Sequence, residues 1–215
     1  ACIFGNGDTG KGSGVAIDPG DNIRISRCVF DSFYNGISLG SDATNVRVSQ
    51  NHIRNSYGSG VNALTGTGSG ALTLEDNVFS SGNKSLAASI ADVRIGNVFG
   101  AVIRGNTFSS PNVTWSVRAE NTVVRLRLVD NHIAFTNSVG PAFSIGSSSD
   151  SGICIQYDGN TSAATPSAGV RGGQLIIPAV FSTKASASTA LNIAYHSGIP
   201  DRGTWALGDR VYNSN

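Results

Sequence analysis

The sequence predicts an all-β parallel solenoid, and three observations point to it: a repeated phrase, its regular spacing and the alternation of apolar residues inside it. A phrase of eight residues recurs along the first three quarters of the 215-residue chain. The copies are Ile23–Phe30, Val46–Ile53, Leu72–Phe79, Ala101–Phe108 and Leu126–Ile133, with partial copies at Cys2–Phe4 and Ile153–Asp158. A repeat of roughly 20–50 residues is typical of architectures in which identical units stack.

The sixth position of the phrase marks the period of the repeat. Its residues are Cys2, Cys28, Asn51, Asn77, Asn106, Asn131 and Asp158, which cover 156 residues in six intervals, a mean of 26. Apolar residues alternate within each copy, as at Ile23 and Ile25, and this period of two indicates a strand with one buried face. An aromatic or β-branched residue two places past the marker turns inward again. We therefore expect seven stacked rungs.

Each coil carries a second predicted strand, which begins 13–17 residues before the marker. These strands are Gly14–Ile17, Gly36–Leu39, Gly60–Ala63, Val93–Ile95, Trp115–Val117 and Phe143–Ile145. Turns rich in Gly, Ser, Asn and Asp join them, and no helical stretch intervenes. Two or three short strands per coil suit parallel coils that stack ~4.8 Å apart.

The asparagine column has a physical reason of its own. Asparagine tolerates the left-handed conformation of a tight corner, and its amide both donates and accepts, so stacked asparagines can form a ladder. Cys2 and Cys28 occupy the same column on neighbouring coils. Their Cα atoms are close enough for a disulfide, but their Cβ vectors point the same way, so we expect free thiols.

The asparagine column, the coil length and the lack of helical stretches resemble the right-handed parallel β-helix of the pectate-lyase-like superfamily. The resemblance covers about residues 1–160, over which the repeat predicts six to seven coils. After Asp158 the phrase fails, and Gly159–Gly169 is interpreted as a linker. Gln174–Phe181 and Thr189–Tyr195 then look like strands, so we expect a β-helix over 1–160 and a small C-terminal β module over 161–215.

The closing stretch Gly203–Asn213 resembles a phrase from the C-terminal parts of bacteriophage tail spikes: Gly-Thr-Trp, then Gly-Asp, then Val-Tyr-Asn. The resemblance implies a homotrimer in the virion tail that recognises bacterial surface polysaccharide, with or without depolymerising it. A secreted bacterial lyase, hydrolase or epimerase of the same superfamily is one alternative, and a non-catalytic stalk is another. Because the chain holds no Met and begins in mid-coil, we expect it to be a piece of a longer protein.

Charge and composition limit the classes of partner that the chain is expected to bind. Fifteen Lys and Arg face fourteen Asp and Glu, a formal net charge of +1, which is too balanced for the basic surface that nucleic acids need. The longest apolar run, around Leu175–Phe181, is far shorter than the ~20 residues of a membrane span. The cysteines lack metal-ligand spacing, and His52 and His132 lie three coils apart in one column. We expect no nucleic-acid partner, no membrane insertion, no metal and no cofactor.

Two arginines form the first candidate site. Arg24 and Arg47 lie four positions before the marker on successive coils and point outward, in a column that continues through Thr73, Val102, Arg127 and Cys154. Stacked like charges repel unless an anion or a carboxylate lies between them. The functional interpretation is contact with an acidic sugar or an ion pair between subunits. The alternative is two solvated arginines that fan apart.

Two aspartates form a candidate catalytic pair. Asp76 and Asp130 precede the marker two coils apart, with Gly105 between them. Two coil steps are ~9.6 Å, the upper limit for the two carboxyls of an inverting glycosidase. Arg104 and His132 are neighbouring candidates for substrate binding, and Glu75 shares the column of Arg104. The alternative is that both aspartates accept backbone hydrogen bonds in turns.

Trp115 is the aromatic candidate. The alternation of Val113, Trp115 and Val117 points it into the core, whereas on an outer wall it would stack on sugars. Trp205, Tyr195 and Tyr212 lie in the predicted terminal module. The aspartate clusters and the Gly-His-Gly of pectin-cleaving hydrolases are missing, as are the calcium-binding aspartates of pectate lyases. An active centre upstream of Ala1 is therefore a further expectation.

Overall fold

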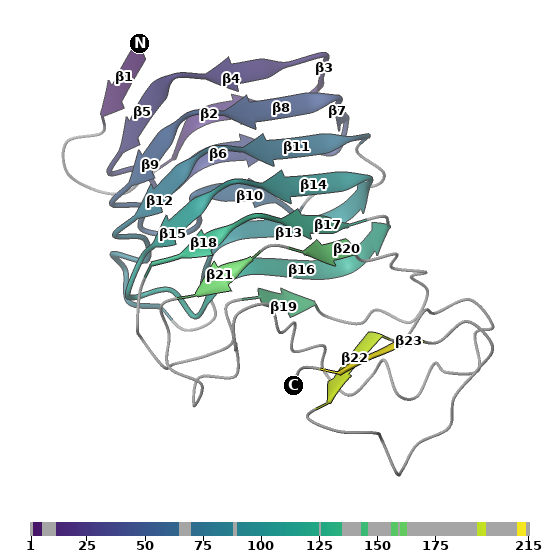
Figure 1. Cartoon of the computed structure of the whole chain (residues 1–215). Helices are drawn as coiled ribbons and strands as arrows, with labels where there is room; N and C mark the ends of the chain where they lie inside the picture. Colours follow the sequence, from purple (N-terminus) through teal and green to yellow (C-terminus); the bar gives the residue numbers. More distant parts are fainter. Residues whose placement is uncertain are drawn as a thin grey trace.

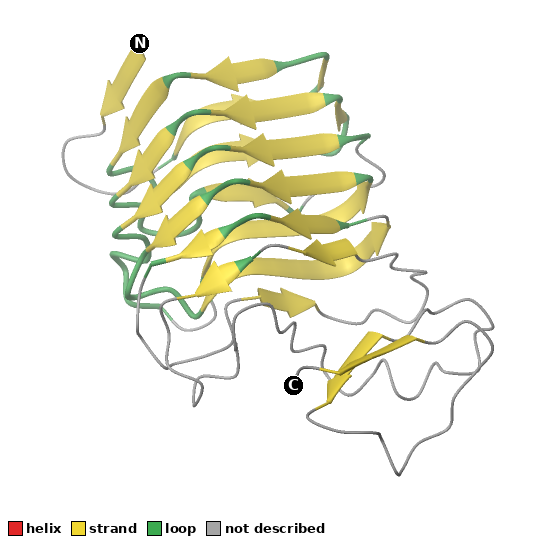
Figure 2. Ribbon diagram, in the orientation of Figure 1, coloured by secondary structure: helices red, strands yellow, loops and turns green. Residues whose placement is uncertain are grey.

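Three parallel β-sheets run along the stacked coils in the computed structural model of the chain (Figure 1). The structure describes residues 2–5, 12–64, 70–87, 90–124, 126–134, 143–145, 156–158, 160–162, 193–196 and 210–213. All regular elements in these ranges are strands, and the coils form a right-handed parallel β-helix of about five turns (Figure 2). The predicted fold class is confirmed, with about five turns where the repeat predicts six to seven coils.

Each complete coil contributes one strand to each sheet, and the first sheet has one further strand at the N-terminal end. The first sheet stacks β1 (Cys2–Gly5), β5 (Cys28–Asp31), β9 (His52–Arg54), β12 (Val78–Ser80), β15 (Thr107–Ser109), β18 (His132–Ile133) and β21 (Thr161–Ser162). The second sheet stacks β2 (Ser13–Ile17), β6 (Asn35–Leu39), β10 (Val61–Ala63), β13 (Ala91–Phe99), β16 (Trp115–Val124) and β19 (Phe143–Ile145). The third sheet stacks β4 (Arg24–Ser26), β8 (Val46–Ser49), β11 (Leu72–Glu75), β14 (Ala101–Arg104), β17 (Arg127–Val129) and β20 (Gln156–Asp158).

The repeated phrase folds as two strands rather than one. Its first half lies in the third sheet and its second half lies in the first sheet, with the marker at the corner between them. Inward residues of all three sheets form the core, in which Phe30, Phe79 and Phe108 are almost fully buried. The rings of Phe79 and Phe108 stack with centroids 5.1 Å apart. A short pair, β3 (Gly20–Asp21) and β7 (Ala43–Thr44), lies outside the three sheets.

The asparagine ladder is confirmed and runs through the buried corner. Asn51 Nδ2 donates to Asn77 Oδ1 over 3.0 Å, and the same bond recurs from Asn77 to Asn106 and from Asn106 to Asn131. Each Nδ2 also donates to a backbone carbonyl on the preceding coil, such as Ile25 O. Because the amide is satisfied at both ends, a buried polar column stabilises the stack instead of weakening it.

The reason expected for asparagine in this column is wrong in one respect. The left-handed residue of the corner is the one before the ladder, with φ of 53° at Asp76, 62° at Gly105 and 53° at Asp130. The ladder asparagines have no positive φ among the described backbone angles. Asparagine is therefore required for its hydrogen bonds rather than for its backbone.

The last rung of the predicted repeat is out of register by two residues. Asp158 pairs with Val129, and the ladder continues from Asn131 to Asn160, whose Oδ1 accepts from Asn131 Nδ2 over 2.9 Å. The outward column that begins with Arg24 accordingly ends at Gln156, the register partner of Arg127, and not at Cys154. Asn160 takes the ladder position because its amide both accepts from Asn131 and donates to Leu128 O, which the carboxylate of Asp158 could not do.

The predicted thiols at the start of the chain are confirmed as free. Cys2 and Cys28 are register partners on β1 and β5, and neither forms a disulfide. Cys28 takes the first ladder position, where its backbone N–H donates to Asn51 Oδ1 over 3.0 Å. A thiol therefore begins the column without supplying an amide of its own.

In the C-terminal part of the chain, the residues that the structure describes form two strands. β22 (Ile193–His196) and β23 (Arg210–Asn213) pair in parallel, with Tyr195 opposite Tyr212. The linker expected at Gly159–Gly169 lies mostly outside the described residues, as do the strand expected at Gln174–Phe181 and Trp205. The division into 1–160 and 161–215 stays a prediction.

Candidate functional site

The outward face of the third sheet brings two arginines together. Arg24 on β4 and Arg47 on β8 are register partners, as the repeat predicts. Both are exposed because they alternate with Ile25, Val46 and Val48, which point into the core. Parallel strands lie ~4.8 Å apart, so the two positive side chains leave the backbone side by side.

Glu75 neutralises one of the two arginines. It ends β11 one coil further on, where its side chain is 6% exposed and is ion-paired with both Arg47 and Arg104. Arg104 binds it with two nitrogens, Nε at 2.9 Å and Nη2 at 2.7 Å from Oε2. Burial raises the pKa of Glu75, but the hydrogen bonds and charges of the two arginines outweigh burial and hold that pKa below its ordinary value. The carboxylate is therefore ionised at neutral pH.

The carboxylate expected near the stacked arginines is thus Glu75 of the same chain, and it pairs with Arg47 but not with Arg24. Arg24 has no hydrogen-bond or ion-pair partner among the residues that the structure describes. Its charge is left to solvent or to a bound anion.

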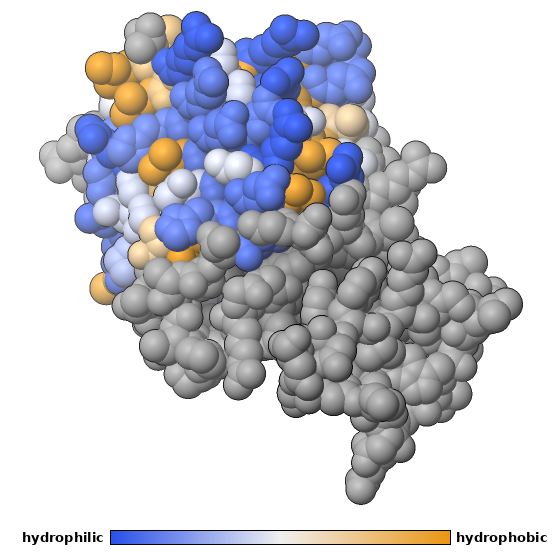
Figure 3. Space-filling view, in the orientation of Figure 1, coloured by the Kyte–Doolittle hydropathy of each residue, from blue (hydrophilic) through white to orange (hydrophobic). Residues whose placement is uncertain are grey.

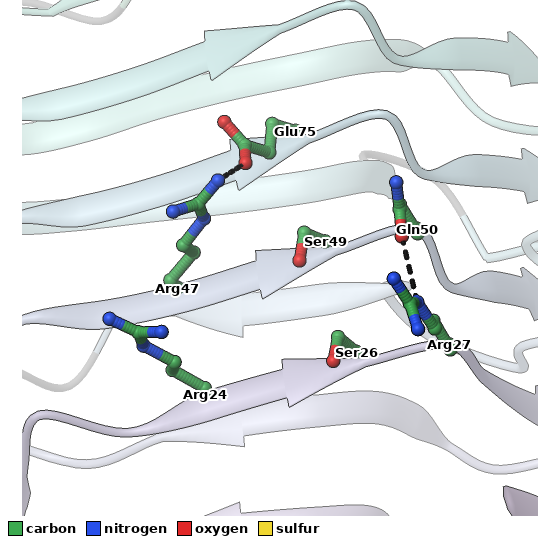
Figure 4. Close-up of a pocket in the computed structure, with 7 residues that line it drawn as sticks. All are labelled: Arg24, Ser26, Arg27, Arg47, Ser49, Gln50 and Glu75. Atoms are coloured by element: carbon green, nitrogen blue, oxygen red, sulfur yellow. Dashed lines mark hydrogen bonds and ion pairs between the residues drawn. The ribbon is translucent and has the colours of Figure 1, made fainter. Parts of the chain in front are cut away.

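These residues surround an open pocket with a volume of about 310 Å³, which we call the arginine pocket. Its lining consists of Arg24, Ser26, Arg27, Arg47, Ser49, Gln50 and Glu75. Arg24 and Arg47 form one side, Arg27 and Gln50 form the other, and Ser26 and Ser49 lie between them (Figure 4). Three guanidinium groups and one carboxylate give the lining an excess of positive charge.

The side formed by Arg27 and Gln50 is held by the corner of the coil. Both residues have a φ of 56°, so both are left-handed turn residues at the position before the ladder. Arg27 Nε donates to Gln50 Oε1 over 3.1 Å, across two successive coils (Figure 4). This bond leaves the two Nη groups of Arg27 available to a ligand. The surrounding face is largely hydrophilic, with separate apolar patches (Figure 3).

The predicted catalytic aspartates lie outside the arginine pocket. Asp76 and Asp130 are both exposed, and they occupy the left-handed turn position two coils apart. Asp76 Oδ1 lies 2.5 Å from the point that a Cβ on Gly105 would occupy. The carboxylate of Asp76 therefore takes part of the space between the two aspartates that the glycine leaves open.

The other two predicted site residues lie on different faces. His132 is exposed on the first sheet, where Val78 and Thr107 separate it from His52 in the same column. Trp115 belongs to the second sheet, where it pairs with the buried Ala91 and is itself half-buried. Its ring carries the guanidinium of Arg118 at 4.4 Å from the ring centre. A cation over the ring is a favourable contact for this tryptophan.

Sequence reasoning found the arginine pair but missed the rest of the pocket. Ser26, Arg27, Ser49 and Gln50 were not candidates, although each follows Arg24 or Arg47 within three residues. The signal that could have found them is the repeat itself, because residues two and three places after the arginines fall in neighbouring columns. Neighbouring columns whose side chains are exposed on the same face can then line one pocket.

No family model, curated protein or solved structure matches the chain. None of the described residues forms a helix of the length and apolarity needed to cross a membrane. Within the described ranges, no three His, Cys, Asp or Glu side chains are grouped as metal ligands. The geometry of the arginine pocket is therefore the basis for a functional inference.

Proposed function

We propose that the chain binds an acidic bacterial surface polysaccharide in the arginine pocket, as the receptor-binding part of a phage tail spike. The observation that supports the proposal is the register of Arg24 over Arg47, with one carboxylate for three guanidinium groups. A carboxylate or sulfate on a sugar can take two parallel hydrogen bonds from a guanidinium. Ser26, Ser49 and Gln50 supply neutral partners for hydroxyl groups.

The shape of the site also favours a polymer. The pocket is open and lies on a face whose coils repeat at ~4.8 Å, so an extended chain can cross several coils without entering a deep cavity. The homotrimer and the location in the virion tail belong to the same proposal through the resemblance of Gly203–Asn213 to tail spikes. A secreted bacterial protein of the same superfamily is the alternative source.

Binding to polygalacturonate, with neutral dextran as the uncharged polymer, tests the proposal by isothermal titration calorimetry. We expect binding to polygalacturonate that weakens as salt rises, because the charges are exposed and screened. Arg24→Ala should weaken it about tenfold, or ~1.4 kcal/mol. Lys84→Ala removes the same charge from an exposed turn and is the matched control. Equal binding of dextran, or equal effects of the two variants, would overturn the proposal.

Cleavage of the polysaccharide is a second candidate function, with Asp76 and Asp130 as acid and base. The two aspartates share a column and are both exposed, which favours this function, and a rise of ~9.6 Å over two coils is at the upper limit for an inverting pair. Incubation with bacterial capsule should then release new reducing ends, and Asp76→Asn or Asp130→Asn should abolish that release. Binding with no new reducing ends would leave the receptor-binding function alone.

A further inference from the structure

A serine and a histidine are hydrogen-bonded on the outward face of the first sheet, away from the arginine pocket. His52 begins β9, and Ser80 ends β12 on the next coil. His52 Nε2 lies 2.8 Å from Ser80 Oγ. The buried residues Ile53 and Phe79 alternate with them, so both side chains point outward. A hydroxyl within hydrogen-bond distance of an imidazole is the geometry of a nucleophile and its base.

The surroundings of His52 keep its imidazole neutral. Val29 and Val78 are its register partners on the two adjacent strands, so apolar side chains flank it on both sides. Burial lowers the pKa of His52, the positive charge of Arg54 lowers it further, and the charge of Asp31 opposes them. An unprotonated imidazole can accept the proton of Ser80 at neutral pH.

Arg54 adds a fixed positive charge to the same face. It follows His52 by two residues on β9, and it is the register partner of Ser80 on one side and of Asp31 on the other. Asp31 Oδ2 accepts from Arg54 Nε at 3.0 Å and lies 2.9 Å from Nη2. The side chain of Arg54 is still 44% exposed. Its charge favours an anion that forms near Ser80.

We propose that Ser80 and His52 are a nucleophile and general base that hydrolyse carboxylic esters of small acyl groups. Ser80 Oγ attacks the ester carbonyl while its proton passes to His52 Nε2. The oxyanion then collapses, the bond to the alcohol oxygen breaks, and the alcohol leaves with the proton from His52. Water, deprotonated by His52, attacks the acyl-serine and releases the carboxylic acid, and Ser80 regains its proton.

The pair Val29 and Val78 indicates the acyl group that would fit. Val78 is 38% exposed and Val29 is half-buried, directly beside His52. An acetyl or another short acyl chain can rest on these two apolar side chains, which offer too little surface to hold a large one. This inference does not depend on the proposal that the arginine pocket binds a polysaccharide.

The chain contains its own matched control for the serine. Ser109 is the register partner of Ser80 on the following coil and is half-buried in the same way. Its Oγ donates to the backbone carbonyl of Phe79 at 3.0 Å instead of contacting a histidine. If the histidine activates Ser80, the two serines should differ in reactivity although they share a column.

Labelling of the intact chain with a fluorophosphonate probe, followed by peptide mass spectrometry, tests the proposal without a substitution. We expect the label on Ser80 and not on Ser109. Label at equal levels on both, or on neither, would overturn the proposal. Because the unmodified protein is used, a failure to fold cannot explain the result.

Hydrolysis of p-nitrophenyl acetate gives the second readout. We expect Ser80→Ala and His52→Gln each to lower the rate at least a hundredfold, the lower end of what general base catalysis supplies, and Ser109→Ala to leave it unchanged. The rate should fall as acid protonates His52, with a midpoint below the ordinary value for histidine. Activity that persists in Ser80→Ala would contradict the proposal.

Discussion

Asparagine at the ladder position bonds through both ends of its amide. Asn106 is fully buried; its Nδ2 donates to Leu74 O and to Asn131 Oδ1, and its Oδ1 accepts from Asn77. Asn106→Ala removes these bonds and leaves buried partners unsatisfied, each at a cost of ~1–3 kcal/mol. We expect the substitution to lower the free energy of unfolding, measured by urea denaturation, by at least about 3 kcal/mol. Thr107→Ala, at the half-buried next position, should change it little, and an equal loss in both would contradict the ladder's role.

A buried carboxyl makes the stability of the fold depend on pH. Asp92 on β13 is 2% exposed, and its Oδ2 has no hydrogen-bond partner among the described residues. Burial raises its pKa to about 8, and a hydrogen bond with Ser110 only partly opposes this. The ordinary value is 3.8, so between about pH 4 and pH 8 the folded state holds a proton that the unfolded state has lost. The free energy of unfolding therefore falls as pH rises through that window, by up to ~1.4 kcal/mol per pH unit.

Asp92→Asn tests this linkage, because an amide of the same shape does not titrate. We expect the difference in unfolding free energy between variant and wild type to grow from pH 5 to pH 8, measured by urea denaturation, and to level off above pH 8. The lowered pKa values of Glu75, Asp31 and His52 act with the opposite sign, but they are common to both proteins and cancel. A difference that does not vary with pH would show that Asp92 is ionised when buried.

At the scale of the element, three glycines in or next to strands of the second sheet lie too close to neighbouring residues to carry a side chain. A Cβ on Gly36 would lie 2.6 Å from Ile53 Cγ2 and 2.7 Å from the carbonyl oxygen of Gly60. Gly14 and Gly60 are blocked in the same way, by Phe30 and Phe79. The glycines let the sheet close over the large inward residues of the first sheet.

Gly36→Ala should therefore destabilise the solenoid by ~1–3 kcal/mol, the usual cost of overpacking. Gly5 provides the control, since a Cβ there would meet nothing within 4 Å. Thermal unfolding of Gly36→Ala and Gly5→Ala compares the two sites. A Gly36→Ala variant as stable as wild type would mean that the second sheet lies further from the first than the structure shows.

Glu75 would link the stability of the third sheet to the ligand binding proposed for the arginine pocket. It occupies Arg47 and Arg104 at once, so it competes with any anion for Arg47. We expect Glu75→Gln to tighten binding of polygalacturonate several-fold and to lower the melting temperature, since two ion pairs are lost around a buried group. Weaker binding would show that Glu75 positions Arg47 for the ligand rather than withholding it.

Much of the element structure follows from sequence, because a period of two and a period of 26 are properties of the chain alone. The two-residue shift in register at the last rung shows what the sequence alone does not predict. The run Asp158-Gly159-Asn160 offers two polar residues that fit the phrase, and only the hydrogen bonds of the ladder select Asn160. In the site, the stacking of Arg24 on Arg47 followed from the repeat. The burial of Glu75 did not, because it depends on contacts with Arg104 in its own column and with Arg47 in a neighbouring column.

At the scale of the whole molecule, the proposed homotrimer has a direct consequence for mass. One chain is 22.1 kDa, so three would scatter light as a particle of about 66 kDa. Size-exclusion chromatography with light scattering should give that mass at micromolar concentration, as the tail-spike interpretation requires. A mass of 22 kDa across the concentration range would remove the trimer from the proposal and leave the pocket as a site within one chain.

The most direct test of the central claim, that superposed coils place two arginines around one bound anion, is a double-mutant cycle in polygalacturonate binding. Arg24→Ala, Arg47→Ala and the double variant are compared with wild type by calorimetry at low salt. Because one anion would contact both side chains, we predict a coupling energy of about 1 kcal/mol or more. Effects that add within ~0.3 kcal/mol would mean that the two arginines act independently, and the arginine pocket would not be a single site.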